Sequence, residues 1–172
     1  MPVQFRMATA AKSLSVFSTN DLPDVSERRF AILVSEWNSE VTEALFEGAH
    51  QTLLQYGAKA ENVIRGNVPG SYELTLGAQW FAQRDDIDAV IALGCVIQGE
   101  TKHNDYINHA VAQGLTNVGL KTGKPVIFGV LTPNDQQQAL DRAGGKHGNK
   151  GDEAAITAIK MIGLQEQVYS KF

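Results

Sequence analysis

The amino-acid sequence predicts an α/β protein in which helices cover both faces of a four-stranded parallel sheet, forming one three-layer domain. Its 172 residues lie within the roughly 100–200 residues of an ordinary domain. Four short apolar runs do not alternate with polar residues, which is typical of strands buried on both faces. Helical patterns separate these runs, whose starts are about 26 to 37 residues apart, close to the roughly 30 residues of a βαβ unit.

The apolar runs and stripes define each element in turn. The predicted strands are residues 30–34, 62–68, 89–93 and 126–131. Three helices between them have apolar residues three or four positions apart: Val41, Leu45, Ala49 and Leu53; Leu74, Gly77, Ala78 and Phe81; Ile107, Ala110, Val111, Gly114 and Val118. Two more helices follow the last strand, residues 136–143 and 152–164, and Gly144 and Gly145 are expected to end the first of them.

Composition excludes several classes of protein. The 15 basic and 19 acidic side chains give a net charge of −4, which offers no basic field for general nucleic-acid binding. The longest apolar runs are about five or six residues, too short to span a bilayer. The single cysteine, Cys95, rules out an intramolecular disulfide and a Cys-based zinc cluster. The four histidines show no metal-ligand spacing, so we predict no metal.

We predict an N-terminal arm over residues 1–28, a single domain over residues 29–166 and a tail over residues 167–172. The first 20 residues contain two basic residues and no acid, which weakly resembles a transit peptide. A flexible arm is the preferred interpretation. Residues 14–17 could pair as a short edge strand, and residues 21–24 are expected to form a turn around Pro23.

Ligands of open parallel sheets bind beyond the carboxyl ends of the strands. Trp37 follows the first strand, where its indole could stack on a flat heterocycle or serve as a lid on the next helix. After the second strand, Glu73 and backbone amides could hold the hydroxyls of a polyol, with Ser71 as a helix N-cap being the simpler alternative.

The loop after the third strand carries two further candidates. Gly99, Glu100 and Thr101 are expected to open a helix, where free amides favour an anion such as phosphate, although Thr101 could be an ordinary cap. His103 lies in the first turn, where the helix dipole favours a neutral imidazole that could act as a base. The alternative is a surface histidine.

A basic segment stands out in this mildly acidic chain. It contains Arg142, Lys146, His147 and Lys150, interleaved with glycines. The backbone could therefore approach a phosphate closely, while the guanidinium of Arg142 makes a bidentate contact with it. The same residues could instead cap the preceding helix. Cys95 is expected to be a small buried side chain rather than a nucleophile.

Taken together, these loops resemble the 6,7-dimethyl-8-ribityllumazine synthase family. The resemblance covers roughly residues 29–164 and rests on Trp37 and Asn38, on residues 68–73, 94–103 and 128–132, on Gln138, Ala139 and 142–144, and on 149–151 with 153–155. It implies a transferase that condenses 5-amino-6-(D-ribitylamino)uracil with 3,4-dihydroxy-2-butanone 4-phosphate, the penultimate step of riboflavin biosynthesis, without metal or cofactor. It also implies a flavodoxin-like fold with strand order 2-1-3-4.

The resemblance implies a role for each site residue. His103 corresponds to the proton-transfer residue. The phosphate would be bound by Gly99, Glu100, Thr101 and Arg142, and the other substrate contacts would come from Trp37, Asn38, Ser71, Tyr72, Glu73, Cys95, Val96, Ile97, Phe128 and Lys150. Of these, Phe128, Arg142 and Lys150 would come from an adjacent subunit. Glu100 departs from the small residue common there, so its carboxylate must point away from the phosphate.

The resemblance further implies a cytoplasmic homo-oligomer, either a pentamer or a sixty-subunit cage, that can associate with riboflavin synthase and binds neither nucleic acid nor membrane. Residues 14–17 would then add a strand to a neighbouring subunit's sheet. Two alternatives stay open. One is a non-catalytic flavin or lumazine carrier on the same scaffold, and the other is a flavodoxin-like electron carrier, which would need a phosphate loop where residues 36–39 lie.

Overall fold

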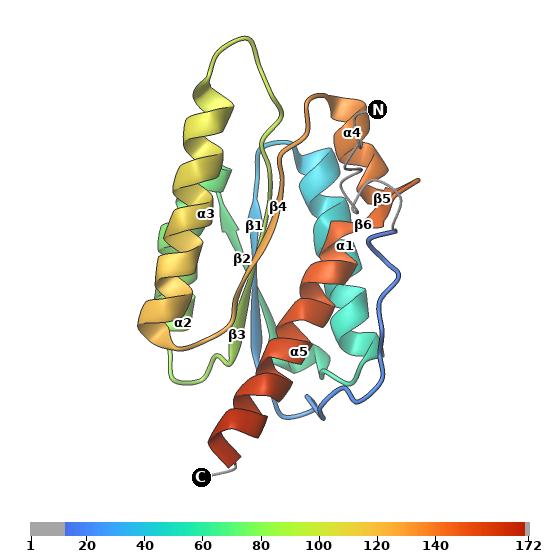
Figure 1. Ribbon diagram of the computed structural model, residues 1–172, viewed down its shortest axis with the longest axis vertical. Coiled ribbons are helices and arrows are strands. Elements are labelled where there is room, and N and C mark those ends of the chain that lie inside the picture. Colours follow the sequence, from blue (N-terminus) through green and yellow to red (C-terminus); the bar gives the residue numbers. More distant parts are fainter. Residues whose placement is uncertain (1–12, 171–172) are drawn as a thin grey trace, which may run out of the picture.

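The computed structural model describes residues 13–170 and confirms the predicted α/β fold: a four-stranded parallel sheet between two layers of helices (Figure 1). The strand order is β2-β1-β3-β4, as in the flavodoxin-like arrangement that was expected. The strands are β1 (Phe30–Ser35), β2 (Val63–Val68), β3 (Ala89–Cys95) and β4 (Val126–Leu131). Their carboxyl ends point toward the top of Figure 1.

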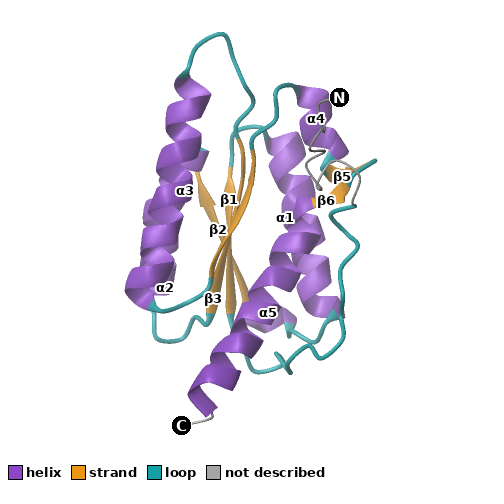
Figure 2. Cartoon of the chain, viewed as in Figure 1, coloured by secondary structure: helices purple, strands orange, loops and turns teal. Residues whose placement is uncertain are grey.

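Each face of the sheet is covered by two helices (Figure 2). Helices α1 (Ser39–Gln55) and α5 (Lys150–Ser170) cover one face, and α2 (Leu74–Ala82) and α3 (His103–Thr122) cover the other. Alternate residues of β3 enter the two cores, and every residue of that strand is buried. Full burial of a large aliphatic side chain contributes roughly 1.5–3 kcal/mol, so the non-alternating apolar strands suit the two-sided packing.

The region after β4 differs from the prediction. Helix α4 covers only Gln136–Asp141, and the glycine-rich segment folds into an antiparallel hairpin of β5 (Ala143–Gly145) and β6 (Gly148–Asn149). Gly144 and Gly148 have φ angles of 104° and 81°, a left-handed region that glycine enters without steric cost. The glycines therefore form a hairpin rather than a helix cap.

Three further boundaries were predicted incorrectly. Gly94 and Cys95 belong to β3 rather than to the loop after it, and α3 begins at His103, so Gly99 precedes the helix instead of opening it. Helix α5 is longer than the predicted residues 152–164, because polar contacts rather than an apolar stripe hold its last turns.

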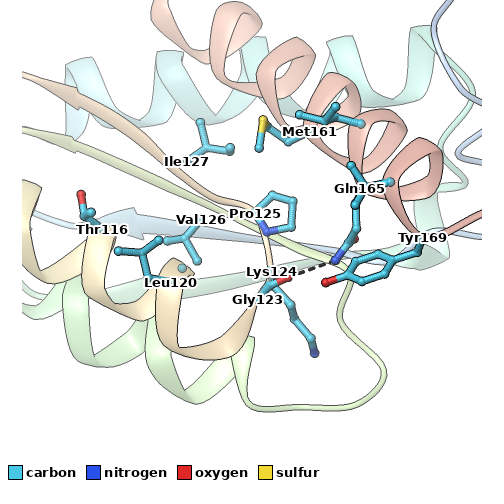
Figure 3. A pocket seen from close by; sticks show the side chains of 13 residues that line it. Thr116, Leu120, Gly123, Lys124, Pro125, Val126, Ile127, Met161, Gln165 and Tyr169 are labelled. Carbon is cyan, nitrogen blue, oxygen red and sulfur yellow. Dashed lines mark hydrogen bonds between the residues drawn. The ribbon is translucent and has the colours of Figure 1, made fainter. Parts of the chain in front are cut away.

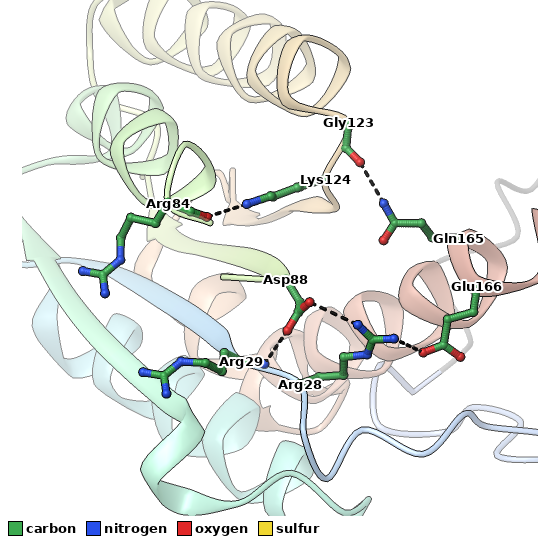
Figure 4. A network of polar contacts seen from close by, with 8 residues as sticks. All are labelled: Arg28, Arg29, Arg84, Asp88, Gly123, Lys124, Gln165 and Glu166. Atoms are coloured by element: carbon green, nitrogen blue, oxygen red, sulfur yellow. Dashed lines mark hydrogen bonds and ion pairs between the residues drawn. The ribbon is translucent and has the colours of Figure 1, made fainter. Parts of the chain in front are cut away.

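These polar contacts lie at the amino ends of the strands (Figure 4). Arg28 donates to Asp88 at 3.3 Å and to Glu166 of α5 at 2.6 Å, while Gln165 donates to the carbonyl of Gly123 at 3.0 Å. The end of the sheet opposite the carboxyl-end loops is thus tied together by hydrogen bonds and ion pairs.

Residues 14–17 form no strand within the chain, and Leu14 and Ser15 lie in a turn. Their pairing as an edge strand with a neighbouring subunit therefore stays a prediction. Residues 1–12 of the predicted arm and 171–172 of the predicted tail lie outside the described part. Among residues 13–170, no helix is both long enough and apolar enough to cross a membrane.

Candidate functional site

The loop after β1 places Trp37 at the carboxyl edge of the sheet. Its amide donates to the carbonyl of Pro69 at 3.1 Å, which ties this loop to the loop after β2. The indole lies against Gly70, where a Cβ would be only 2.6 Å from two ring carbons. The side chain is nevertheless 67% exposed. The backbone thus holds an indole with a free face for stacking on a ring.

Asn38 connects the first loop to β3. Its backbone is left-handed, with φ 59° and ψ 45°, a conformation that asparagine tolerates better than most residues. Its side-chain Nδ2 donates to the carbonyl oxygen of Cys95 at 2.9 Å. The asparagine therefore fixes both the turn into α1 and its distance from the third strand.

The segment after β2 forms a short 3-10 turn, η2 (Ser71–Glu73), that Glu73 closes. The amide of Gly70 donates to Oε2 of Glu73 at 3.0 Å, and the amide of Glu73 donates back to the carbonyl of Gly70 at 3.3 Å. The N-cap interpretation of Ser71 is therefore wrong. Tyr72 beside it is 57% exposed, so its ring is available at the edge of the site.

Two serine hydroxyls are buried directly beneath this turn. Oγ of Ser71 and Oγ of Ser35 have no hydrogen-bond partner among residues 13–170. Both lie over Gly94, where a Cβ would be 2.5 and 3.3 Å from them, respectively. Buried hydroxyls usually have a partner, so these two stand out as unsatisfied polar groups at the base of the site. Ser35 was not among the predicted site residues, although it is the polar end of an otherwise apolar strand.

The loop after β3 extends the edge toward α3. The Cys95 thiol is buried, and burial raises its pKa to about 11, so it is neutral and unsuited to nucleophilic attack. Val96 and Ile97 are half-buried, whereas Gly99, Glu100 and Thr101 are exposed. Exposed His103 is the first residue of α3, and its amide donates to Oγ1 of Thr101 at 3.4 Å.

Three of the four predicted basic residues, Arg142, Lys146 and Lys150, have local side-chain partners. Arg142 donates through Nη1 to the carbonyl of Gln138 at 3.0 Å, as the helix-capping alternative predicted. Lys146 pairs with Asp141 at 3.1 Å, and Lys150 pairs with Glu153. Hydrogen bonding from Gln137, followed by that from Lys146, lowers the pKa of the buried Asp141 carboxyl. The Gln138 bond uses one of the three guanidinium nitrogens of Arg142, which can still approach an anion.

The predicted site residues form two groups rather than one. The first group comprises Trp37, Asn38, residues 71–73, residues 95–97, residues 99–101 and His103, at the carboxyl ends of β1, β2 and β3. The second comprises Phe128, Arg142 and Lys150. Phe128 and Lys150 line a cavity of about 280 Å³ at the edge strand β4, and no residue of the first group lines it. The amide of Lys150 donates to the carbonyl of Arg142 at 2.8 Å.

A larger cavity, of about 530 Å³, contains none of the predicted site residues (Figure 3). It lies between α3 and α5 at the start of β4, and apolar side chains such as Leu120, Met161 and Val168 line much of it. Lys124 and Tyr169 also line it, but the Lys124 ammonium donates to the carbonyl of Arg84 and none of the predicted site residues is present, so this cavity is not a candidate for the chemistry. In the described part of the chain, no three His, Cys, Asp or Glu side chains are grouped as a metal would require.

Comparison with known proteins agrees with this geometry. A family model described as 6,7-dimethyl-8-ribityllumazine synthase matches residues 27–166. Proteins with the same description from Cytophaga hutchinsonii and Parabacteroides distasonis are 60% and 53% identical, each match covering 91% of this chain and 98% of the relative. A third, from Flavobacterium johnsoniae, is 51% identical over 94% of this chain and 85% of the relative.

Proposed function

The chain belongs to the 6,7-dimethyl-8-ribityllumazine synthase family, and from that premise we propose how its residues carry out the reaction. The enzyme condenses 5-amino-6-(D-ribitylamino)uracil with 3,4-dihydroxy-2-butanone 4-phosphate, releasing phosphate and water, in riboflavin biosynthesis. The observation that carries this function is the family match over residues 27–166, which includes every predicted site residue.

The first group binds the pyrimidine substrate. The free face of Trp37 stacks on the ring, and the exposed ring of Tyr72 lies nearby. The ribityl hydroxyls bond to Glu73, whose second carboxylate oxygen is available, and to the unpartnered hydroxyl of Ser71. Backbone groups of residues 95–97 and the amide of Asn38 line the ring, which explains why a neutral thiol is tolerated at Cys95.

Phosphate and proton transfer belong to the loop before α3. Gly99 and Thr101 offer exposed backbone amides to the phosphate, and Arg142 supplies the guanidinium charge. The carboxylate of Glu100 points away from the phosphate. The pyrimidine amine attacks the ketone to give an imine, and water leaves. His103 then takes the proton next to that imine, which allows phosphate to depart. The ribityl-bearing nitrogen then attacks the carbonyl formed by this elimination, and loss of a second water closes the lumazine ring. Since binding already aligns both substrates, modest acid–base catalysis suffices.

The family is an oligomeric enzyme, and we propose that each site is completed by a second copy of this chain. Support comes from the separation of Phe128 and Lys150 from the first group and from the exposure of Trp37 and Tyr72. The apolar cavity between α3 and α5 offers surface for subunit contact. The assembly is a pentamer, or a cage of pentamers, located in the cytoplasm and close to riboflavin synthase, which consumes the product.

The function is tested by mixing the purified protein with both substrates. We expect lumazine fluorescence and released phosphate to rise together, at a ratio of one to one. Binding of lumazine or flavin without product would instead indicate a non-catalytic carrier, for which neither the comparisons nor the site offers support. Light scattering of the same sample measures whether the chain is a pentamer or a cage.

A further inference from the structure

The N-terminal segment contacts the hairpin that carries the basic residues. We propose that Ser15 is a positioning residue for the phosphate-bearing substrate, acting by holding the β5–β6 hairpin that presents Arg142 and Lys150. This inference rests on the proposed role of these two residues. It does not follow from the resemblance, which placed Ser15 only within a strand that pairs with another subunit.

The hydroxyl of Ser15 bridges two parts of the hairpin base. Its Oγ donates to Oδ2 of Asp152 at 2.6 Å, in the first turn of α5, and accepts the amide of Asn149 at 2.9 Å, in β6. Its donor and acceptor functions are therefore both used. The bond to the carboxylate is charge-assisted, which makes it stronger than a bond between neutral groups.

The backbone on either side of Ser15 follows the hairpin closely. The amide of Leu14 donates to the carbonyl of His147 at 2.7 Å. A Cβ on Gly148 would lie 2.6 Å from Oγ of Ser13 and 2.8 Å from the amide nitrogen of Ser15. The arm therefore lies directly on the turn between β5 and β6, in contact with the backbone itself.

The position of the hairpin determines where the basic groups point. The amide of Lys150 donates to the carbonyl of Arg142 at 2.8 Å, so the two residues move together. Asn149 between them is tied on its other side to the carbonyl of Ala44 in α1, at 2.9 Å. Without the Ser15 hydroxyl, the Asn149 amide loses its acceptor, and the hairpin keeps the contact with α1 and the backbone bond from Leu14 but loses its side-chain support from the arm. A bidentate guanidinium contact needs a defined orientation, so we expect the affinity for phosphate to fall.

The test measures the Michaelis constants for the two substrates separately, together with inhibition by inorganic phosphate, in Ser15→Ala, Ser15→Thr and Ser18→Ala. Ser18 is an exposed serine of the same arm and serves as the matched control. For Ser15→Ala we expect KM for the butanone phosphate, and the inhibition constant for phosphate, to rise about tenfold, which corresponds to the misplaced Arg142 losing one hydrogen bond to the charged phosphate. KM for the pyrimidine should not change. Ser15→Thr keeps the hydroxyl and should restore the wild-type values, and Ser18→Ala should match wild type.

Equal changes in both Michaelis constants, or no change in either, would overturn the proposal. Asp152→Asn weakens the same bond from its other partner and provides a second variant in case Ser15→Ala does not fold. It should raise KM for the phosphate-bearing substrate selectively, and failure to do so counts against the proposal. Arg142→Ala separates the two levels of inference. If Arg142→Ala leaves phosphate binding unchanged, the proposed roles of Arg142 and Ser15 both fail. If Arg142→Ala weakens phosphate binding but the Ser15 variants do not, only the role of Ser15 is wrongly assigned.

Discussion

The contact between Trp37 and Gly70 gives the sharpest prediction for the pyrimidine side of the site. Gly70 has extended backbone, with φ −127° and ψ 176°, which alanine adopts without strain. In Gly70→Ala the new Cβ would lie 2.6 Å from the indole carbons. Since carbon atoms pack at about 3.5–4.0 Å, the ring must move by roughly 1 Å. The exposed indole has solvent into which it can shift.

This displacement should affect catalysis far more than stability. A shift of about 1 Å in a positioning group can cost about 10²-fold in rate, so we expect kcat/KM for the pyrimidine to fall by roughly that factor. The free energy of unfolding should change by less than about 1 kcal/mol, because replacing glycine stabilises a compatible position by about 0.4–1 kcal/mol through the unfolded chain. That gain offsets the weakened ring contact.

Steady-state kinetics and fluorescence measure both effects. Trp37 and Trp80 are the two tryptophans of the chain, so a Trp80→Phe background lets the emission report on Trp37 alone. Gly119→Ala is the control, since its Cβ would lie 3.4 Å from the carbonyl of Lys124, on α3 and outside the predicted site. The reasoning is refuted if Gly70→Ala changes the emission of Trp37 while kcat/KM stays within about twofold of wild type, which is well below the loss expected for a 1 Å shift.

Three further predictions concern the histidine, the cysteine and a close helix contact. His103→Ala should lower kcat by about 10²-fold or more without abolishing turnover, because substrate alignment persists; wild-type kcat would exclude His103 as the proton carrier. The pKa of Cys95, raised to about 11, keeps the thiol protonated in the folded state, so stability falls as pH rises from the ordinary thiol value toward 11. Iodoacetamide at pH 8 should accordingly label native protein far more slowly than protein in urea, and equal labelling rates would contradict the burial. Gly151→Ala would place a Cβ 2.0 Å from the carbonyl oxygen of Leu45, so the unfolding free energy measured in urea should fall by about 3 kcal/mol. An unchanged midpoint of urea unfolding would show that α1 and α5 separate easily.

The sheet could be predicted because its two central strands, β1 and β3, are buried on both faces, whereas the edge strands β2 and β4 are partly exposed. A run such as residues 30–34 carries no polar residue, and few arrangements other than a central parallel strand accept it. The glycine-rich segment could not be assigned in the same way. Glycine is common both at helix ends and in hairpin turns, and only the three-dimensional structure shows that Gly144 and Gly148 have positive φ angles and that Gly148 lies against the N-terminal segment.

Part of the candidate site could also be predicted from position alone. Trp37 and Glu73 follow strand ends, and parallel topology brings such residues to one edge. The buried hydroxyls of Ser35 and Ser71 could not be predicted, because their missing partners are a property of the three-dimensional contacts around Gly94. Ser15 escaped prediction for a similar reason, since it is 134 residues away from Asn149 in the sequence.

The separation of the two groups of site residues has a genetic consequence. If the next copy completes each site, the contact runs head to tail around a ring, and each copy gives one half-site and receives another. A copy defective at His103 and a copy defective at Lys150 would then damage opposite halves. In randomly mixed rings, about one site in four would combine the two intact halves. Two alleles that are each severely impaired would therefore complement one another within a single cell.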